Sequence, residues 1–280
     1  MPFPIRNLYS RTYYKSMIGG VLFKKHFRNI HTYCMFIGYP RSGHSLIGAL
    51  IDAHPNAIIG MERDTLGLIE MKYKKNQIIY LIIKNSIQFS KEQNNCWTGY
   101  SYKIPGGYQG EYTDLLVIGD KKGGKSTERI GNNPSLLSKF FSVIKYPVKI
   151  LHIVRNPFDI ISTMYKRNLA EGVELDRDLL KFKIDMFFRK AEINRQLLED
   201  PELNILTVYH ESLIKNPQKE LSRIFLFLGL KEEKEYLKEC ISIIYKEPHL
   251  SRHEIFWPEN LKQQVYKKLK NYSFLKEYEF

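Results

Sequence analysis

The segment from Gly38 to Ser45, which reads GYPRSGHS, has the spacing of a loop that binds phosphate groups. It lies between an apolar run, which predicts a strand, and an amphipathic run, which predicts a helix. Such a loop points backbone N–H groups and a helix N-terminus at an anion. Nucleotide-hydrolysing loops of this kind have Lys directly before the Ser, where this chain has His44, and the cation here is Arg41. The loop therefore suits a phosphate-like group better than the magnesium-dependent hydrolysis of ATP or GTP.

A second polar segment follows the β-branched run from Val148 to Val154. Arg155 comes directly after this predicted strand, and Ser162 lies about two turns into the helix predicted next. Arginine offers a rigid fork that can bind a phosphate through two hydrogen bonds, and a hydroxyl adds a further donor. Alternatively, Arg155 only caps the end of a strand and Ser162 faces a neighbouring helix.

A carboxylate follows the short strand predicted at residues 57–60. Glu62 could accept a proton from a substrate, or it could cap a helix or form an ion pair. Asp64 is the second candidate for a base, and it is also a natural N-cap for the helix predicted from Thr65. The two carboxylates therefore leave the identity of a base open.

A polar, glycine-containing segment, GDKKGG, follows the strand predicted at residues 115–118. Lys121 in this segment could stabilise negative charge, with Lys122 as a substitute, or both could lie in solvent. After the strand predicted at residues 205–208, His210 and Glu211 could form a catalytic pair, although a structural role at the strand end is the simpler interpretation.

The elements around these segments predict an α/β fold. Continuous apolar strands alternate with amphipathic helices, which is typical of a buried parallel sheet between helical layers. In such sheets, ligands bind at the carboxyl ends of the strands, where all of these polar segments begin. We therefore expect a P-loop NTPase-like central parallel sheet flanked by helices.

Length and composition are consistent with one domain. The chain has 280 residues, of which 43% are hydrophobic. Residues 1–32 form a basic leader of uncertain structure, and residues 33–280 form the predicted domain. No apolar run approaches the roughly 20 residues that a membrane span needs. The net charge of +13 indicates either an anionic substrate or membrane surface, or a lysine-rich solvated surface.

Cysteine usage predicts a reducing compartment, which we take to be the cytoplasm. Cys34, Cys96 and Cys240 are few, odd in number and far apart, so a disulfide framework is not expected. Cysteine and histidine do not cluster with metal-ligand spacing, and no nucleic-acid-binding motif is present. We therefore expect no metal, no nucleic-acid partner and no transmembrane segment, with peripheral membrane contact left open.

Together, the Pro-Arg-Ser-Gly loop and the Arg155 segment resemble those of the sulfotransferase family. The resemblance extends from about Tyr33 to the C-terminus. It implies a P-loop-like α/β enzyme that moves a sulfuryl group from 3′-phosphoadenosine 5′-phosphosulfate (PAPS) to a hydroxyl or amine, without a metal. Family members act on carbohydrates, lipids, phenols, steroids and protein tyrosines. An acceptor that fits a glutamate base is a glycan, a glycolipid or a small alcohol.

The resemblance also implies roles for individual residues. Arg41 would hold the 5′-phosphosulfate, Glu62 would be the base, and Lys121 would stabilise the bridging oxygen. The 3′-phosphate would be bound by Arg155 and Ser162, with a weaker match at Arg252. The remaining predicted donor-binding residues are Ser42, Gly43, His44 and Ser45. His44 would either donate to a phosphate oxygen or pack over the loop.

Two alternative functions remain at this stage. A P-loop kinase or nucleotide hydrolase would need an acidic residue to hold magnesium, and Asp120 is the available candidate. A non-catalytic nucleotide-binding module would need neither base nor lysine. Aromatic residues before residue 115 could stack on a sugar or on adenine, although ordinary packing is the better explanation for most of them: Trp97, Tyr100, Tyr102 and Tyr108.

Overall fold

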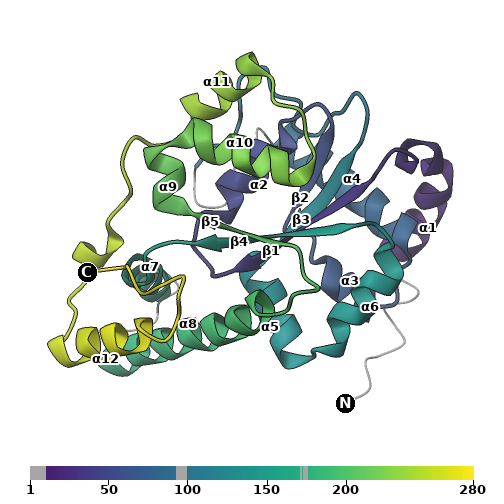
Figure 1. The fold of residues 1–280 in the computed structure, drawn as a ribbon. Coiled ribbons are helices and arrows are strands. Elements are labelled where there is room, and N and C mark those ends of the chain that lie inside the picture. The colour runs from purple at the N-terminus through teal and green to yellow at the C-terminus, as the bar shows by residue number, and fades with distance from the viewer. Residues whose placement is uncertain (1–10, 93–99, 171, 173–175) are drawn as a thin grey trace.

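A computed structural model describes residues 11–92, 100–170, 172 and 176–280 of the chain. These residues form a five-stranded parallel sheet with the strand order β2-β3-β1-β4-β5 and helices on both faces (Figure 1). The strands are β1 (Thr32–Gly38), β2 (Ala57–Met61), β3 (Val117–Lys121), β4 (Val148–Val154) and β5 (Ile205–Tyr209). The predicted P-loop-like α/β architecture is therefore confirmed.

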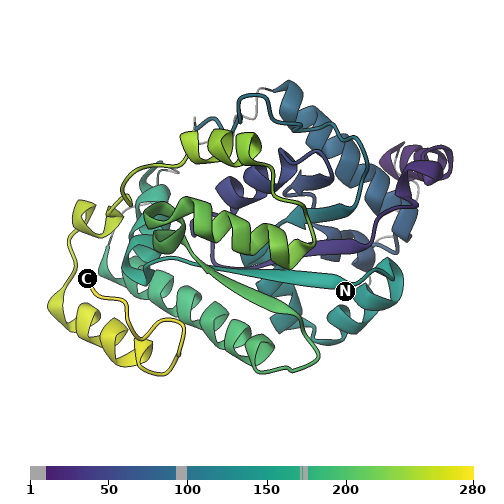
Figure 2. The same cartoon turned by 45° about the horizontal axis from the view of Figure 1, so that its top comes forward.

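The α-helices of the described residues are α1 (Arg11–Leu22), α2 (His44–Asp52), α3 (Thr65–Glu70), α4 (Lys75–Lys91), α5 (Gly123–Asn132), α6 (Ser135–Ile144), α7 (Pro157–Ala170), α8 (Arg177–Leu198), α9 (His210–Lys215), α10 (Pro217–Leu228), α11 (Lys234–Ser242) and α12 (Glu259–Leu269). Two short 3₁₀ helices, η2 (Lys24–Phe27) and η3 (Ser251–Glu254), complete the set. Figure 2 shows α10 and α11 over one face of the sheet.

The side chains of β1 alternate between the two faces of the sheet, and each face is covered by its own layer of helices. Every residue of β1 is buried, so the strand has no polar face. Cys34 and Phe36 pack into the core cluster formed with α2, α10 and α11, whereas Tyr33 and Met35 pack into the cluster formed with α3, α4 and α6. Because successive side chains of a strand point to opposite faces, β1 divides the protein into these layers.

The strand predicted at residues 115–118 begins later and extends further than expected. β3 continues through Asp120 and Lys121, and α5 starts at Gly123, so the predicted GDKKGG loop is mostly regular structure. Gly119 makes this possible, because a Cβ there would lie 2.3 Å from the Cys34 carbonyl oxygen of the paired strand. α5 then packs against β1 through residues spaced like one helix face: Gly123, Ser126, Thr127 and Ile130.

Three further regions were predicted wrongly or only loosely: one predicted helix is divided, residues 100–112 form a loop rather than a hairpin, and part of the leader is helical. The helix predicted at residues 65–91 is two helices, α3 and α4, because Lys72 adopts a φ of 64° between them. Residues 100–112 contain no strand of the sheet, and their loop is tied to the end of α2 by a hydrogen bond from Tyr108 N to Ala53 O of 2.9 Å. The leader contains α1, which lies against α4 (Figure 1). Trp97 and Cys96 lie outside the described residues.

Candidate active site

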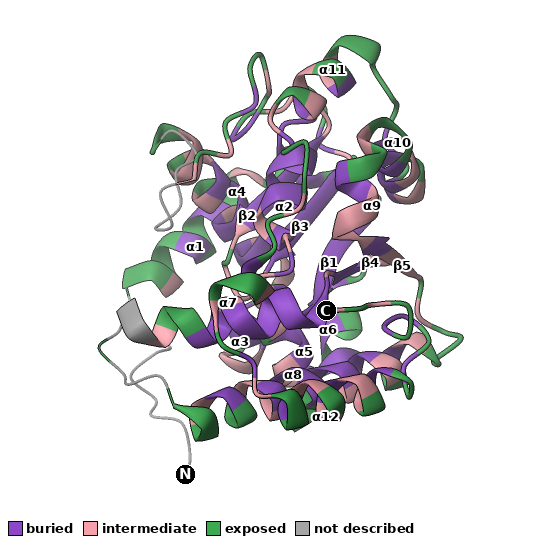
Figure 3. Cartoon of the chain, turned by 90° about the vertical axis from the view of Figure 1, so that its left-hand side faces the viewer, coloured by how far each residue is buried: buried purple, intermediate pink, exposed green. Residues whose placement is uncertain are grey.

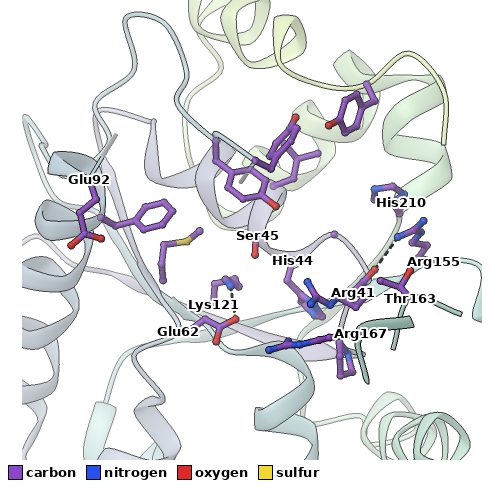
Figure 4. Close-up of a pocket in the computed structure, with 18 of the residues that line it drawn as sticks. Arg41, His44, Ser45, Glu62, Glu92, Lys121, Arg155, Thr163, Arg167 and His210 are labelled. Carbon is purple, nitrogen blue, oxygen red and sulfur yellow. Dashed lines mark hydrogen bonds and ion pairs between the residues drawn. The ribbon is translucent and has the colours of Figure 1, made fainter. Parts of the chain in front are cut away.

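The carboxyl ends of all five strands meet around one open pocket of about 840 Å³ (Figure 4). At or just beyond these strand ends, the residues that line it are Arg41, Glu62, Lys121, Arg155 and His210. A pocket of this size at this edge is where a parallel α/β sheet binds small ligands. The structure therefore brings together the main candidates from each polar segment.

One side of the pocket, which we call the cationic half, is built around the loop between β1 and α2. Gly43 precedes α2 with a φ of 96°, and no side chain caps the helix. The first-turn N–H groups of α2 are therefore left for a ligand, where the helix dipole favours negative charge. Arg41 and Ser45 line the pocket beside them, and Arg41 has a φ of 67°.

His44 packs into this loop. Its Nε2 lies 3.2 Å from the Ile37 carbonyl oxygen, and its Nδ1 lies 3.0 Å from Ser42 Oγ. Burial lowers the pKa of His44 to about 4, so the ring is neutral, with the Nε2 proton donated to the carbonyl oxygen. Ser42 is itself fully buried and also within 2.8 Å of the Tyr39 carbonyl oxygen. Both side chains therefore shape the loop from within.

A glycine of α5 fits against this histidine. A Cβ on Gly123 would lie 1.9 Å from His44 Nε2, and one on Gly124 would lie 2.8 Å from Pro40 Cδ. The two glycines that sequence analysis placed in a loop thus allow α5 to approach the phosphate-type loop closely.

Glu62 and Lys121 meet at the centre of the pocket (Figure 4). Glu62 Oε1 lies 2.9 Å from Lys121 Nζ, and Oε2 lies 2.8 Å from Lys122 Nζ. Burial alone would raise the pKa of Glu62, but the two lysines outweigh it and lower it to about 2. The Lys121 side chain is 5% exposed and the Glu62 side chain 53%, so the carboxylate is open to a second substrate.

Two nearby aspartates hold this carboxylate in position. Asp120 is buried and accepts hydrogen bonds of 2.8 Å from the N–H groups of Arg63 and Thr65, which follow Glu62 in the turn between β2 and α3. Asp64 caps α3 and binds Arg129 through both carboxylate oxygens. Structural contacts therefore occupy both carboxylates. Asp64 is not placed to act as the alternative base, and Asp120 is not placed to bind magnesium.

Arg155 lines the cationic half beside the loop. It donates to the carbonyl oxygens of Arg41 and His249. Its Nε is buried without a hydrogen-bond partner among the described residues, as is Nδ1 of His210. A ligand entering this wall could supply the missing partners of these two atoms.

The structure does not bring Ser162 and Arg252 to the pocket. Ser162 is fully buried, and its Oγ accepts a hydrogen bond of 2.9 Å from Trp257 Nε1. Arg252 donates to the Glu279 carbonyl oxygen and lies 3.6 Å from Asp159 Oδ2. The hydroxyl of α7 that lines the pocket belongs to the next residue, Thr163.

His210 and Glu211 do not form a pair. His210 packs against Gly43, where a Cβ would lie 2.5 Å from His210 Cδ2, and burial lowers its pKa to about 3. Glu211 instead accepts hydrogen bonds of 2.8 Å from Asn156 N and Tyr278 Oη. The simpler structural interpretation of this dipeptide agrees with these contacts.

The opposite side of the pocket, which we call the aromatic half, comes mostly from α4 and the loop after it. Its lining residues are Met61, Asn85, Gln88, Phe89, Glu92, Tyr100, Tyr102 and Tyr245. Tyr100 anchors it, with ring centroids 4.6 Å from Tyr102 and 5.2 Å from Tyr245 and a hydrogen bond to the Ile243 carbonyl oxygen. Sequence analysis missed the α4 residues, although Asn85, Gln88, Phe89 and Glu92 have the spacing of one helix face.

The described residues contain no group of three His, Cys, Asp or Glu side chains arranged to hold a metal ion. Nor is any described helix long and apolar enough to cross a bilayer.

Arg167 of α7 also lines the cationic half and was not predicted from the sequence.

A sulfotransferase domain model matches residues 32–276, and the chain therefore belongs to the sulfotransferase family. This match confirms the predicted membership of the PAPS-dependent sulfotransferases, and with it the general reaction, sulfuryl transfer. By sequence, the chain matches no curated protein.

Solved sulfotransferase structures share the fold at low sequence identity. A sulfotransferase domain from the curacin biosynthetic pathway is 16% identical, with a TM-score of 0.55 over 90% of this chain and 98% of that one. The sulfotransferase domain of the Synechococcus PCC 7002 olefin synthase is 15% identical, with a TM-score of 0.51 over 86% and 94%. A mouse sulfotransferase in complex with PAP is 16% identical, with a TM-score of 0.52 over 89% of each chain.

Proposed function

We propose that this pocket transfers a sulfuryl group from PAPS to a hydroxyl of a glycan, glycolipid or small alcohol, with Glu62 as the base. The observation that carries the proposal is the Glu62–Lys121 contact, because it lies between a cationic half and an aromatic half of the same pocket (Figure 4). A group-transfer enzyme needs this order of donor site, reacting groups and acceptor site.

The cationic half suits the anionic donor. Arg41 and the uncapped N-terminus of α2 would hold the 5′-phosphosulfate. Arg155 and Thr163 would hold the 3′-phosphate, since the unpartnered Nε of Arg155 is buried on this wall and the Thr163 hydroxyl lines the pocket. In the free protein this hydroxyl donates to the Asp159 carbonyl oxygen at 2.8 Å, so the phosphate would have to replace that acceptor. His44 and Ser42 would act through the loop conformation that they stabilise rather than through direct contact.

The chemistry follows from the two central groups. Glu62 takes the proton of the acceptor hydroxyl while the acceptor oxygen forms a bond to sulfur and the bond from sulfur to the bridging phosphate oxygen breaks. Lys121 stabilises the negative charge that the bridging oxygen gains. In the free protein Lys121 contacts Glu62, so a donor that draws Lys121 away would also raise the basicity of Glu62. Proton removal is thereby coupled to the presence of the donor.

The aromatic half favours an acceptor with many hydroxyl groups. Tyrosine rings can pack on the face of a sugar ring, and amide and carboxylate side chains can bind its hydroxyls. Gln88 and Glu92 are joined by a hydrogen bond of 3.0 Å and present such groups together. These features support a glycan or glycolipid ahead of a small alcohol.

We further assign the reaction to the cytoplasm. Cys34 and Cys240 are buried free thiols, which fits a reducing compartment.

Calorimetric titration tests the donor site. We expect 3′-phosphoadenosine 5′-phosphate to bind the wild type more tightly than AMP, which lacks the 3′-phosphate. Arg155→Ala should weaken that binding by roughly 10- to 150-fold, the usual loss of a hydrogen bond to a charged group. Arg195→Ala on α8 is the control and should change the affinity by less than about threefold, because Arg195 pairs with Glu192 and Glu199 and does not line the pocket. Equal binding of both nucleotides, or tight binding of ATP that requires magnesium, would contradict the proposal and favour a kinase-like protein.

A further inference from the structure

Helix α1 lies on the body of the protein with its small residues inward. Ser16, Gly19 and Gly20 are buried against α4. A Cβ on Gly19 would lie 2.3 Å from the Tyr80 ring, and one on Gly20 would lie 2.9 Å from the backbone of Asn76. The close contact between the two helices therefore fixes which face of α1 points outward.

The outward face is apolar. Its residues follow the spacing of one helix face and are 43–71% exposed: Tyr14, Met17, Ile18, Val21 and Leu22. Figure 3 shows α1 as a largely exposed helix beside α4. A helix packed on a protein usually buries its apolar residues, and a continuous exposed stripe of them marks an interaction surface.

Basic residues surround this stripe. The exposed cations on α1 and the turn after it are Arg11, Lys15, Lys24, Lys25 and Arg28. The first acidic residue of the whole chain is Asp52, so the described part of the leader has no carboxylate side chain to offset them. Asp114 accepts a hydrogen bond from Asn29, at the far end of the leader from the stripe. An apolar stripe flanked by cations complements a surface that is apolar below and anionic above.

We propose that α1 is a peripheral membrane anchor that docks on bilayers containing anionic phospholipids. The stripe enters the boundary between headgroups and acyl chains, and the cations contact the phosphate and carboxylate groups of the lipids. Twelve residues of helix are about 18 Å long, against a hydrocarbon core of about 30 Å, so α1 lies in the interface rather than crossing it.

The anchor and the pocket share helix α4. α1 packs near Tyr80, and Gln88 of the same helix lines the aromatic half about 12 Å further along, at about 1.5 Å per residue. Docking would therefore place the pocket close to the membrane surface. The inference rests on the exposed face of α1 alone and does not depend on the proposed reaction.

Vesicle sedimentation of the full chain tests the proposal. We expect binding to vesicles of phosphatidylcholine with 30% phosphatidylserine and much weaker binding to phosphatidylcholine alone. Replacing two stripe residues with the double variant Ile18→Glu and Val21→Glu should reduce binding at least about 100-fold, because two charges would enter the interface. The control is Leu226→Glu on α10, an equally simple change at an 81% exposed leucine outside α1, which should bind as the wild type does.

The cations are tested separately. Lys24→Gln with Lys25→Gln should weaken binding to the anionic vesicles roughly 30-fold, and 0.5 M salt should weaken wild-type binding as well. Circular dichroism of each variant checks that it is folded. Equal binding to both kinds of vesicle, or binding that the stripe variant retains, would overturn the proposal. A wild-type dimer that Ile18→Glu converts to a monomer would overturn it too, by showing that a second copy covers the stripe.

Discussion

Lys121 Nζ lies 2.9 Å from Glu62 Oε1, so the cation and the carboxylate assigned to the reaction hold each other in the free protein. Lys122 holds the other carboxylate oxygen, at 2.8 Å. A carboxylate bound by two ammonium groups is a weak base. The arrangement therefore keeps Glu62 ionised, and in the proposed reaction Glu62 becomes the stronger base once a donor competes for Lys121.

Glu62→Gln separates catalysis from binding. We expect kcat to fall by roughly 10²- to 10⁴-fold, because the variant lacks a general base but keeps the shape of the site. Affinity for 3′-phosphoadenosine 5′-phosphate should stay the same or increase, because Lys121 loses its competing carboxylate. Initial rates and calorimetry measure the two effects. A variant with unchanged kcat would exclude Glu62 as the base.

Lys122→Ala should raise the pKa of Glu62 above its present value of about 2, because one of its two cations is removed. A base must be ionised to accept a proton, so the rate decreases at pH values below the pKa of the base. Raising that pKa therefore moves the acidic limb of the kcat/KM profile to higher pH. NMR titration of Glu62 and the pH dependence of kcat/KM measure the shift. Lys122→Arg keeps the charge and serves as the control, and an identical pKa in wild type and Lys122→Ala would refute the electrostatic explanation.

Neighbouring hydroxyls on α7 should behave differently. Thr163→Val should weaken binding of 3′-phosphoadenosine 5′-phosphate by roughly 2- to 12-fold, the loss of one ordinary hydrogen bond. Ser162→Ala should leave that affinity unchanged but lower the free energy of unfolding by about 1–3 kcal/mol, because the buried Trp257 N–H loses its acceptor. Calorimetry and urea unfolding distinguish the two. Weaker nucleotide binding by Ser162→Ala, together with unchanged binding by Thr163→Val, would show that Ser162 is the residue that binds the donor.

Gly123→Ala tests how α5 shapes the phosphate-type loop. The new methyl would overlap the His44 ring, so we expect weaker nucleotide binding and a lower melting temperature. Adding His44→Ala should restore part of both losses, since it removes the atoms that clash. A double-mutant cycle measures this coupling, and strictly additive effects would show that the clash occurs elsewhere.

Asp52 makes stability depend on pH. It is buried beside Ser86 and the Ile59 N–H, and burial raises its pKa from 3.8 to about 7. A raised folded-state pKa means that the stability of the protonated form is complete below about pH 3.8 and is lost as the pH rises through 7. Asp52→Asn mimics the protonated acid, so it should raise the melting temperature at pH 8 by at least about 2 °C and by less at pH 5. The exposed Asp178→Asn should show no such difference.

Hydrophobic pattern predicted most of the sheet. Residues 148–154 have the predicted bounds of β4, because a β-branched run leaves few alternatives. α5 was not predicted, since its segment is rich in glycine and its burial depends on contact with β1. The sequence did not predict α1, because a surface helix usually buries its apolar residues, whereas α1 exposes them and buries its glycines.

The site was predictable where residues directly follow strands, and less so on helices. Glu62 and Arg155 could be placed because a strand end fixes the edge of the sheet where they lie. Ser162 and Thr163 differ by about 100° around α7, so choosing between them requires the rotation of the helix, which tertiary packing decides. Arg252 is held away from the pocket by Asp159 and the C-terminal backbone, contacts between segments 93 and 27 residues apart in the chain.

The two halves of the pocket also have different origins along the chain. Most of the aromatic half comes from one continuous stretch between Met61 and Tyr102, whereas the cationic half is assembled from the ends of β1, β4 and β5. Under the proposed function, changes on α4 and the loop after it would alter the acceptor without disturbing the donor loop. Glu62 begins the same stretch, so a segment exchanged to change the acceptor would have to keep that one residue, while the cationic half stays as it is.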